Sequence, residues 1–149
     1  MTTFKGPQNT APRQTSSESG NAWQEDNKVA IGASLTTNDE VIVLDVPAGV
    51  RLHGLKYRAG DLDTGAVLAV NLGYRSVHAE QKLAAAPTYF LAASTAFQAA
   101  QNGWVDIPFE PITFNEPVQI VLKPTVSAAG LPGATSIWAI GEGRILGVA

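Results

Sequence analysis

The sequence predicts an all-β protein: an antiparallel β-sandwich, of which a jelly roll is one form, with a flexible N-terminal arm and one short helix. Short runs rich in β-branched residues recur along the chain, and Gly and Pro residues, 14 and 9 in number, separate them. Hydrophobic residues make up 45% of the chain and charged residues only 15%, which indicates a packed core under a thinly charged surface. At 149 residues the chain fits one folded domain.

The first 27 residues differ in composition from the rest of the chain. They include five hydrophobic residues and are otherwise dominated by Thr, Ser, Gln, Asn, Gly and Pro. Because such a segment cannot offset its own ordering entropy, we expect a flexible polar arm over residues 1–27 and a β-sandwich domain over residues 28–149. The arm either becomes ordered on a neighbouring protein, with Phe4 and Trp23 as aromatic anchors, or is a tail without a role. Trp23 could equally be the first core residue of the domain.

Four stretches predict the first strands of the domain. The β-branched runs over residues 28–34 and 40–46 each predict a strand. The next strand, over residues 50–58, changes its inward parity at Gly54, which predicts a β-bulge at that point. Residues 66–74 then alternate cleanly, and the residues on their apolar face are Leu68, Val70, Leu72 and Tyr74.

The second half of the domain is expected to hold the helix and the closing strands. Residues 94–103 predict the short helix, with Ser94 as its N-cap and Gly103 as its stop. Residues 117–125 alternate as a strand, and residues 135–148 predict the last strand. Many short strands with Gly and Pro between them are typical of a sandwich or barrel.

The strand over residues 40–46 is apolar on both parities. Ile42, Leu44 and Val46 share one parity, and Val41 and Val43 share the other. A sandwich strand buries one face against the partner sheet, so the second face needs cover from a neighbouring segment or subunit. Val41 and Val43 are therefore interface candidates, together with Phe4 and Trp23.

Asp63-Thr64-Gly65 followed by Ala66 is the active-site signature of aspartic proteases. In those enzymes a rigid apolar strand presents the aspartate, whereas residues 57–62 are polar and contain a glycine. Asp61 would also add charge to a dyad that must share one proton. We therefore interpret the motif as a hairpin turn between two strands, in which Asp63→Asn changes stability by about 1 kcal/mol at most. A retropepsin-like protease is the less favoured alternative.

No other pattern in the chain predicts chemistry. There is no cysteine, and the two histidines, His53 and His78, fall on an outward parity and in a loop. We therefore expect no enzyme activity, no catalytic, cofactor-binding or metal-binding residues, and no cofactor. Trp104 and Trp138 could form a platform for a sugar, which keeps a glycan-binding module among the alternatives.

Charge and hydropathy also exclude two classes of partner. The net charge is −3 and no run of Lys or Arg occurs, so we expect no binding to nucleic acid. No apolar run approaches the roughly 20 residues of a membrane helix, and the N-terminus does not read as a signal peptide. We expect no membrane contact and synthesis in a cytoplasm.

Four stretches carry a resemblance to a known family. They are "VIVLDVPAGVRLHGLKY", "AGDLDTGAVLAVNLGY", "TYFLAASTAFQAAQNG" and "EPVQIVLKPTVSAAGLPGATSIWAIGEGRI". From about residue 35 to residue 149 the chain resembles the small β-sandwich decoration proteins, also called head-stabilising or cement proteins, of tailed bacteriophages. The matching features are turn and strand patterns, so no functional residue can be carried over.

The resemblance implies a structural protein of the virion. Such a protein is made in the host cytoplasm, binds the outside of the phage head, contacts the major capsid protein and stabilises the expanded shell. It is often a homotrimer, a state that the two-faced strand 40–46 also favours. The alternative is another virion module, such as a glycan-binding domain, a head fibre or a tail component.

Overall fold

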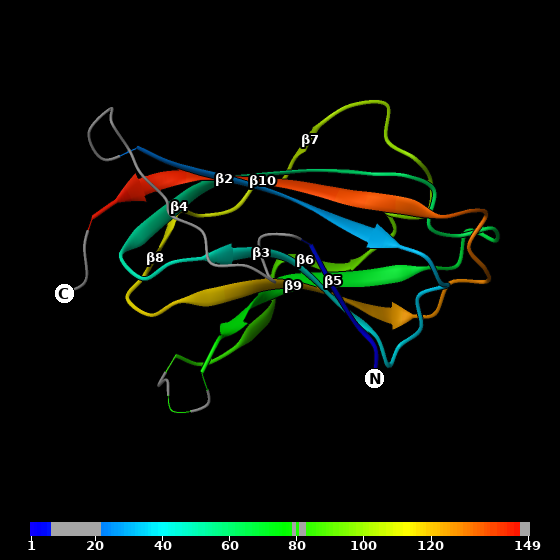
Figure 1. The fold of residues 1–149 in the computed structure, drawn as a ribbon, viewed down its shortest axis with the longest axis horizontal. Coiled ribbons are helices and arrows are strands. Elements are labelled where there is room, and N and C mark those ends of the chain that lie inside the picture. The colour runs from blue at the N-terminus through cyan, green and yellow to red at the C-terminus, as the bar shows by residue number, and fades with distance from the viewer. Residues whose placement is uncertain (7–21, 79, 81–82, 147–149) are drawn as a thin grey trace.

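The computed structural model describes residues 1–6, 22–78, 80 and 83–146, and this part of the chain contains strands and loops but no helix. Two sheets pack face to face as the layers of a sandwich (Figure 1). The first sheet has the order β1 (Thr3–Lys5), β3 (Glu40–Val46), β9 (Val118–Val126), β5 (Ala69–Ser76), β6 (Ala86–Ser94). The second has the order β2 (Ala22–Ile31), β10 (Thr135–Ile145), β4 (Val50–Ala59), β7 (Val105–Asp106), and β8 (Ile112–Phe114) also pairs with β4. Every pair is antiparallel except β1 with β3.

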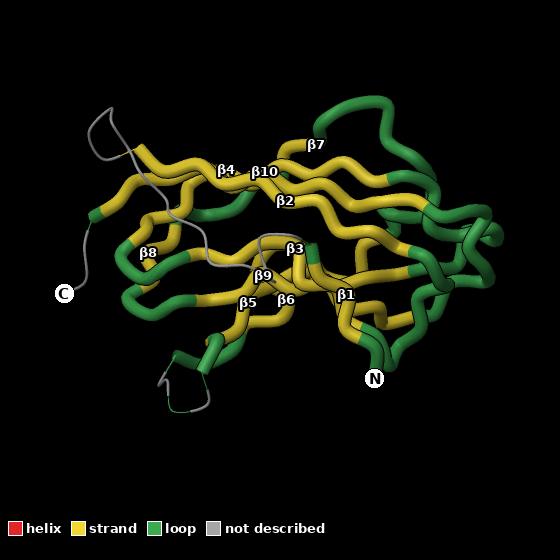
Figure 2. Tube along the Cα trace, in the orientation of Figure 1, coloured by secondary structure: helices red, strands yellow, loops and turns green. Residues whose placement is uncertain are grey.

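The chain crosses repeatedly between the two layers. The links from β3 to β4, from β4 to β5 and from β9 to β10 each join strands of different sheets, as the tube in Figure 2 shows. The edge strands β1 and β2 lie on one side of the sandwich. The edge strands β6 and β7 lie on the opposite side. The predicted antiparallel sandwich is therefore confirmed as two mostly antiparallel layers.

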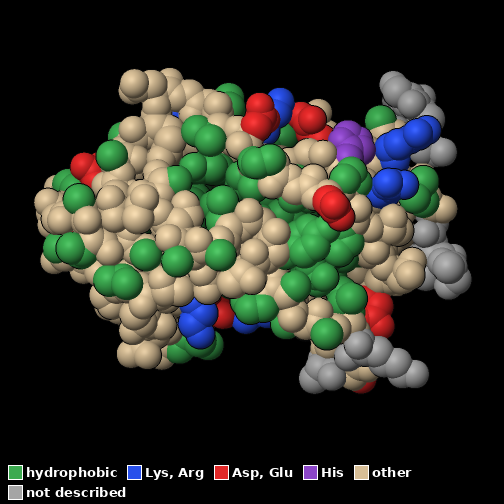
Figure 3. Space-filling model, turned by 180° about the vertical axis from the view of Figure 1, so that it is seen from behind, with side chains coloured by type: hydrophobic (Ala, Val, Ile, Leu, Met, Phe, Trp, Pro, Cys, Tyr) green, Lys and Arg blue, Asp and Glu red, His purple; other side chains and the backbone are tan. Residues whose placement is uncertain are grey.

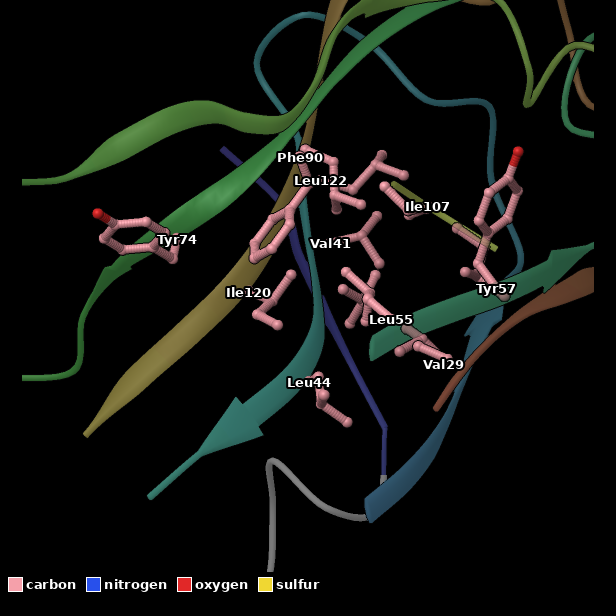
Figure 4. Close-up of a cluster of buried hydrophobic side chains, with 14 of the residues drawn as sticks. Val29, Val41, Leu44, Leu55, Tyr57, Tyr74, Phe90, Ile107, Ile120 and Leu122 are labelled. Carbon is pink, nitrogen blue, oxygen red and sulfur yellow. The ribbon is translucent and has the colours of Figure 1, made fainter. Parts of the chain in front are cut away.

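Alternating side chains from both sheets fill the space between the layers (Figure 4). The predicted apolar face of β5 is buried at every position, and so are the inward residues of β9, which are Val118, Ile120 and Leu122. On β4 the register with β10 shifts beside His53 and Gly54, so that Leu52 and Leu55 both point inward. The predicted bulge at Gly54 is confirmed. Because of this bulge, the apolar side chains on both sides of it point to the same face of the sheet.

A second bulge explains the two-faced apolar strand β3. The register with β9 shifts between Ile42 and Leu44, which leaves Val43 as the extra residue. The bulge changes which parity points inward, so four of the five apolar residues belong to the core: Val41, Val43, Leu44 and Val46. The strand therefore covers most of its apolar surface within its own chain and needs no subunit for this purpose.

The expected boundary of the arm at residue 27 falls inside strand β2. This strand begins at Ala22 and pairs with β10 from its first residue onward. Its inward residues include Trp23, Glu25 and Asn27, all buried. The polar composition of residues 22–27 concealed the strand because two of its inward side chains are themselves polar. Near the N-terminus, β1 forms three register pairs with β3, and residues 7–21 of the expected arm lie outside the described residues.

The helix expected over residues 94–103 is wrong. Ser94 ends β6, and turns and bends follow it. Phe97 is buried and stacks on Tyr57 at 4.5 Å between ring centres. The side chain of Gln98 donates to the Leu68 carbonyl, and Gln101 exchanges two hydrogen bonds with Ala59. These contacts with both sheets outweigh a local helical propensity that is worth only tenths of a kcal/mol per residue.

Candidate interaction surfaces

The Asp-Thr-Gly motif lies in the loop between β4 and β5, which belong to different sheets, so the motif is not a hairpin as expected. The Asp63 side chain is only 4% exposed. Its Oδ1 accepts hydrogen bonds from the backbone N–H groups of Gly65 (3.0 Å) and Ala129 (2.8 Å). Its Oδ2 accepts from those of Val67 and Leu68, both at 2.6 Å. The carboxylate therefore ties its own loop to the loop between β9 and β10.

These contacts determine the ionisation of Asp63. Burial raises the pKa of its carboxyl, but the N–H donors of Leu68, Gly65, Ala129 and Val67 outweigh burial and hold the pKa at about 2. All four bonds favour the charged form, so the group stays ionised at neutral pH. An aspartic protease needs a carboxyl group that shares a proton with a second one and contacts water. Asp63 is a structural brace, and its motif gives no support to the protease alternative.

Three of the four interface candidates are core residues of this chain. Trp23 is 3% exposed, and Val41 and Val43 are also buried. In Figure 4 Val41 lies between the sheets, near Leu55 and Ile120. Phe4 is half-buried in β1 and packs against the same core. The structure of the single chain places Trp23, Val41 and Val43 in the core, and their role at an interface stays a prediction.

A charge-poor flank lies where strand β6 and the segment 95–111 meet. Over residues 86–115 the only charged residues are Asp106 and Glu110. Exposed positions on this flank include Ala92, Ala93 and Trp104, and Trp104 is 47% exposed. Figure 3 shows a face on which hydrophobic side chains gather around the middle, while most charged ones lie toward its edges. We call residues 86–111 the apolar flank.

An aromatic cluster packs between the apolar flank and the core and makes the flank more rigid. Edge-to-face contacts, at 5.0–6.5 Å between ring centres, join Tyr74, Tyr89, Phe90, Phe109 and Phe114. The Tyr89 hydroxyl also donates to the Glu110 carbonyl at 2.8 Å. Each such aromatic pair contributes about 0.5–1.5 kcal/mol beyond its buried area. Sequence reasoning missed this surface, although the long stretch with few charges around "TYFLAAS" was a signal for it.

A cleft of about 150 Å³ lies against the first sheet, and its lining includes Glu40, Arg75 and Lys123. The Arg75 guanidinium donates to both oxygens of Glu40, at 2.8 and 2.9 Å, and to the side-chain oxygen of Gln119. The hydrogen bonds from Arg75 hold the pKa of Glu40 below its usual value against the opposing effect of burial. The pair fastens β3 to β5 across β9 and leaves no free carboxylate for acid–base chemistry.

Within the described residues, no group of three or more His, Cys, Asp or Glu side chains is placed to hold a metal ion. The two histidines are exposed, His53 on β4 and His78 in the loop after β5. Of the two tryptophans considered for a sugar platform, Trp138 lies near the cations of Lys28 and Arg58, and Trp104 has a partly open ring. No helix in this part of the chain is long and apolar enough to cross a membrane.

The sequence matches no protein-family model and no curated protein. Two solved structures share the fold. A chain of the cyanophage Pam1 capsid asymmetric unit has a TM-score of 0.65 and 19% identity, over 91% of this chain and 92% of that chain. A chain in the capsid of Ralstonia phage GP4 has a TM-score of 0.57 and 17% identity, over 92% of this chain and 93% of that chain. Because both coverages are nearly equal, the matched chains are close to this one in length.

Proposed function

We propose that this chain is a structural virion protein that decorates the outside of a phage head, contacts the major capsid protein and stabilises the expanded shell. The observation that carries the proposal is the agreement in fold and in length with chains of two phage capsids. The resemblance of residues 35–149 to decoration proteins points in the same direction. The brace at Asp63, which accounts for the one catalytic motif, favours a role without catalysis.

The surface of the molecule suits a protein that works through contacts. The apolar flank combines an end strand of the first sheet with exposed small residues over a stiff aromatic cluster. A stable interface needs about 800 Å² from each partner. We propose that this flank forms the contact between subunits of a homotrimer, in place of the buried valines of β3. Many copies on one shell would strengthen modest contacts through avidity.

The N-terminal segment is a second candidate for contact with the capsid. We propose that residues before Ala22, where β2 begins, help to attach the protein to its partner. Phe4 is a weaker anchor than expected because it packs on its own core. Pairing of backbone groups with a strand edge of the capsid protein would be the mode of attachment.

The direct test is co-sedimentation of the purified chain with expanded shells assembled from the major capsid protein of the same phage. We expect saturable binding at a fixed ratio of copies and a shell that survives a higher temperature. Light scattering, of the free protein and of protein released from shells, measures the trimer. Shells that sediment without the chain at tens of micromolar protein would refute the proposal.

A glycan-binding module is the second candidate, and the half-exposed ring of Trp104 is the observation that favours it. It predicts binding to polysaccharide from the host cell surface, which Trp104→Ala would abolish while shell binding stays unchanged. Density for the chain on a head fibre or on the tail of the virion would instead indicate a third role, as a component of that fibre or tail.

A further inference from the structure

The outer face of the second sheet carries an excess of positive charge. On β2, β4 and β10 the inward residues alternate with exposed or half-exposed ones, and five outward residues are basic: Lys28, Arg51, Lys56, Arg58 and Arg144. The acidic residues of the same surface are Asp26, Asp106 and Glu142. This surface, which we call the basic face, therefore has a net charge of +2 on a chain whose net charge is −3.

The strand register places four of the five positive charges in two rows at opposite ends of the basic face, and Lys56 lies between the rows. In one row Trp138 of β10 lies opposite Lys28 on one side and Arg58 on the other. In the other row Arg144 lies directly opposite Arg51. Trp138 and Arg144 are six residues apart along β10, so the rows are separated by about 20 Å at 3.3 Å per residue. The three acidic residues lie between the rows, nearer the middle of the strands.

In the part of the chain that the structure describes, most of these cations form no ion pair with a carboxylate. Lys56 pairs with Glu142 at 3.5 Å, whereas no ion pair involves Lys28, Arg51, Arg58 or Arg144 within the described residues. Lys28 and Arg58 lie over the ring of Trp138 at 5.3 and 5.8 Å, a contact that holds two cations near each other without neutralising them.

The row of Arg51 and Arg144 is unfavourable for the free protein. Like charges that are directly opposite on neighbouring strands destabilise a sheet, and no carboxylate of the described residues forms an ion pair with either arginine. Both side chains are exposed, so neither is needed to fill the core. Two facing arginines without a bound carboxylate are expected at a surface where a binding partner supplies the negative charge.

We propose that the basic face docks an acidic protein surface, with the two positive rows meeting carboxylates about 20 Å apart. Within the proposed function, on which this assignment of the partner rests, the acidic surface lies on the phage shell. Protein carboxylates suit the face better than a nucleic acid does. A continuous phosphate backbone would also meet Asp26, Asp106 and Glu142 between the rows.

The test compares two double variants that change the net charge equally. Arg51→Glu with Arg144→Gln removes one positive row of the basic face. Lys123→Glu with Val126→Glu is the control, because both residues are exposed on β9 of the first sheet. We expect wild-type binding to expanded shells to weaken with salt, the first variant to bind at least about tenfold more weakly, and the control to stay within about twofold.

Stability separates a docking role from a structural one. The single variant Arg144→Glu places opposite charges across the strand pair, so its urea midpoint should equal or exceed that of wild type while its shell binding falls. A lower midpoint that parallels the loss of binding would contradict a docking role. Equal binding of both double variants to shells would refute the inference and leave the proposed function standing.

A second probe covers the case in which wild-type protein does not bind shells, so that the proposed function fails. Poly-L-glutamate, titrated at low salt, then tests the basic face by itself. Weaker binding of the Arg51/Arg144 variant than of the control would support the inference, and equal binding would refute it. Tighter binding of wild-type protein to a short DNA duplex than to poly-L-glutamate would show that the face recognises nucleic acid instead.

Discussion

Replacing Asp63 by Asn should destabilise the protein far more than a change in an ordinary turn. Each oxygen of the carboxylate accepts hydrogen bonds from two backbone N–H groups, at 2.6–3.0 Å. An Asn side chain keeps one acceptor oxygen and turns an NH₂ group toward the other pair of donors. Two buried N–H groups then lose their partner, at about 1–3 kcal/mol each. We expect a loss of about 2–6 kcal/mol at pH 7, rather than the roughly 1 kcal/mol expected of a turn.

The dependence on pH follows from the same geometry. The pKa of Asp63 is about 2 in the folded protein and 3.8 as the reference for an unfolded chain. A folded pKa below the unfolded value stabilises the protein above pH 3.8, and this stabilisation disappears as the pH falls toward 2. The shift corresponds to about 2 kcal/mol at most, and we reduce this to about 1–2 kcal/mol because the loop lies near solvent.

Urea unfolding at several pH values, followed by tryptophan fluorescence, measures both effects. Asp61→Asn is the matched control. Asp61 is exposed, and among the described residues it accepts a hydrogen bond only from the N–H of Asp63, which the amide oxygen of Asn can keep. The control should change stability by less than about 0.5 kcal/mol. A similarly small change for Asp63→Asn, or a difference from wild type that is as large at pH 2.5 as at pH 7, would refute the role of Asp63 as a charged brace.

Three further predictions concern the chain outside this loop. Trp23→Ala should lower the free energy of unfolding by about 3–5 kcal/mol, and Trp104→Ala by less than about 1 kcal/mol, in urea titrations. Ala66→Gly should raise the melting temperature, because Ala66 has a φ of 54° that favours glycine; a lower value would contradict this. A chain starting at Ala22 should keep the β-sheet circular dichroism, whereas one starting at Lys28 should lose it; equal spectra would count against the assigned β2.

The sequence predicted the fold wherever local pattern and burial agree. Strand β3 begins and ends at the predicted residues, and the bulge at Gly54 was recognisable because the parity of the apolar residues changes there. Strand β2 was missed in part because Glu25 and Asn27 point inward. The Asn27 amide bonds the Val43 carbonyl of the other sheet, and a partner so distant in sequence is invisible to a local pattern.

The surfaces were harder to predict than the core. Apolar residues on both parities of β3 suggested a subunit interface, but the bulge at Val43 depends on the register with β9. The basic face arises only when strands far apart in sequence come together. Arg51 and Arg144, for example, are opposite each other only because β4 pairs with β10.

A reconstruction of the phage head by electron cryomicroscopy would test the central claim most directly. The particle to use is the virion of the phage whose genome encodes this chain. We expect density on the outside of the shell that fits the two sheets of Figure 1, in contact with the major capsid protein. A fully resolved head without such density, or density for this chain in the tail, would contradict the account.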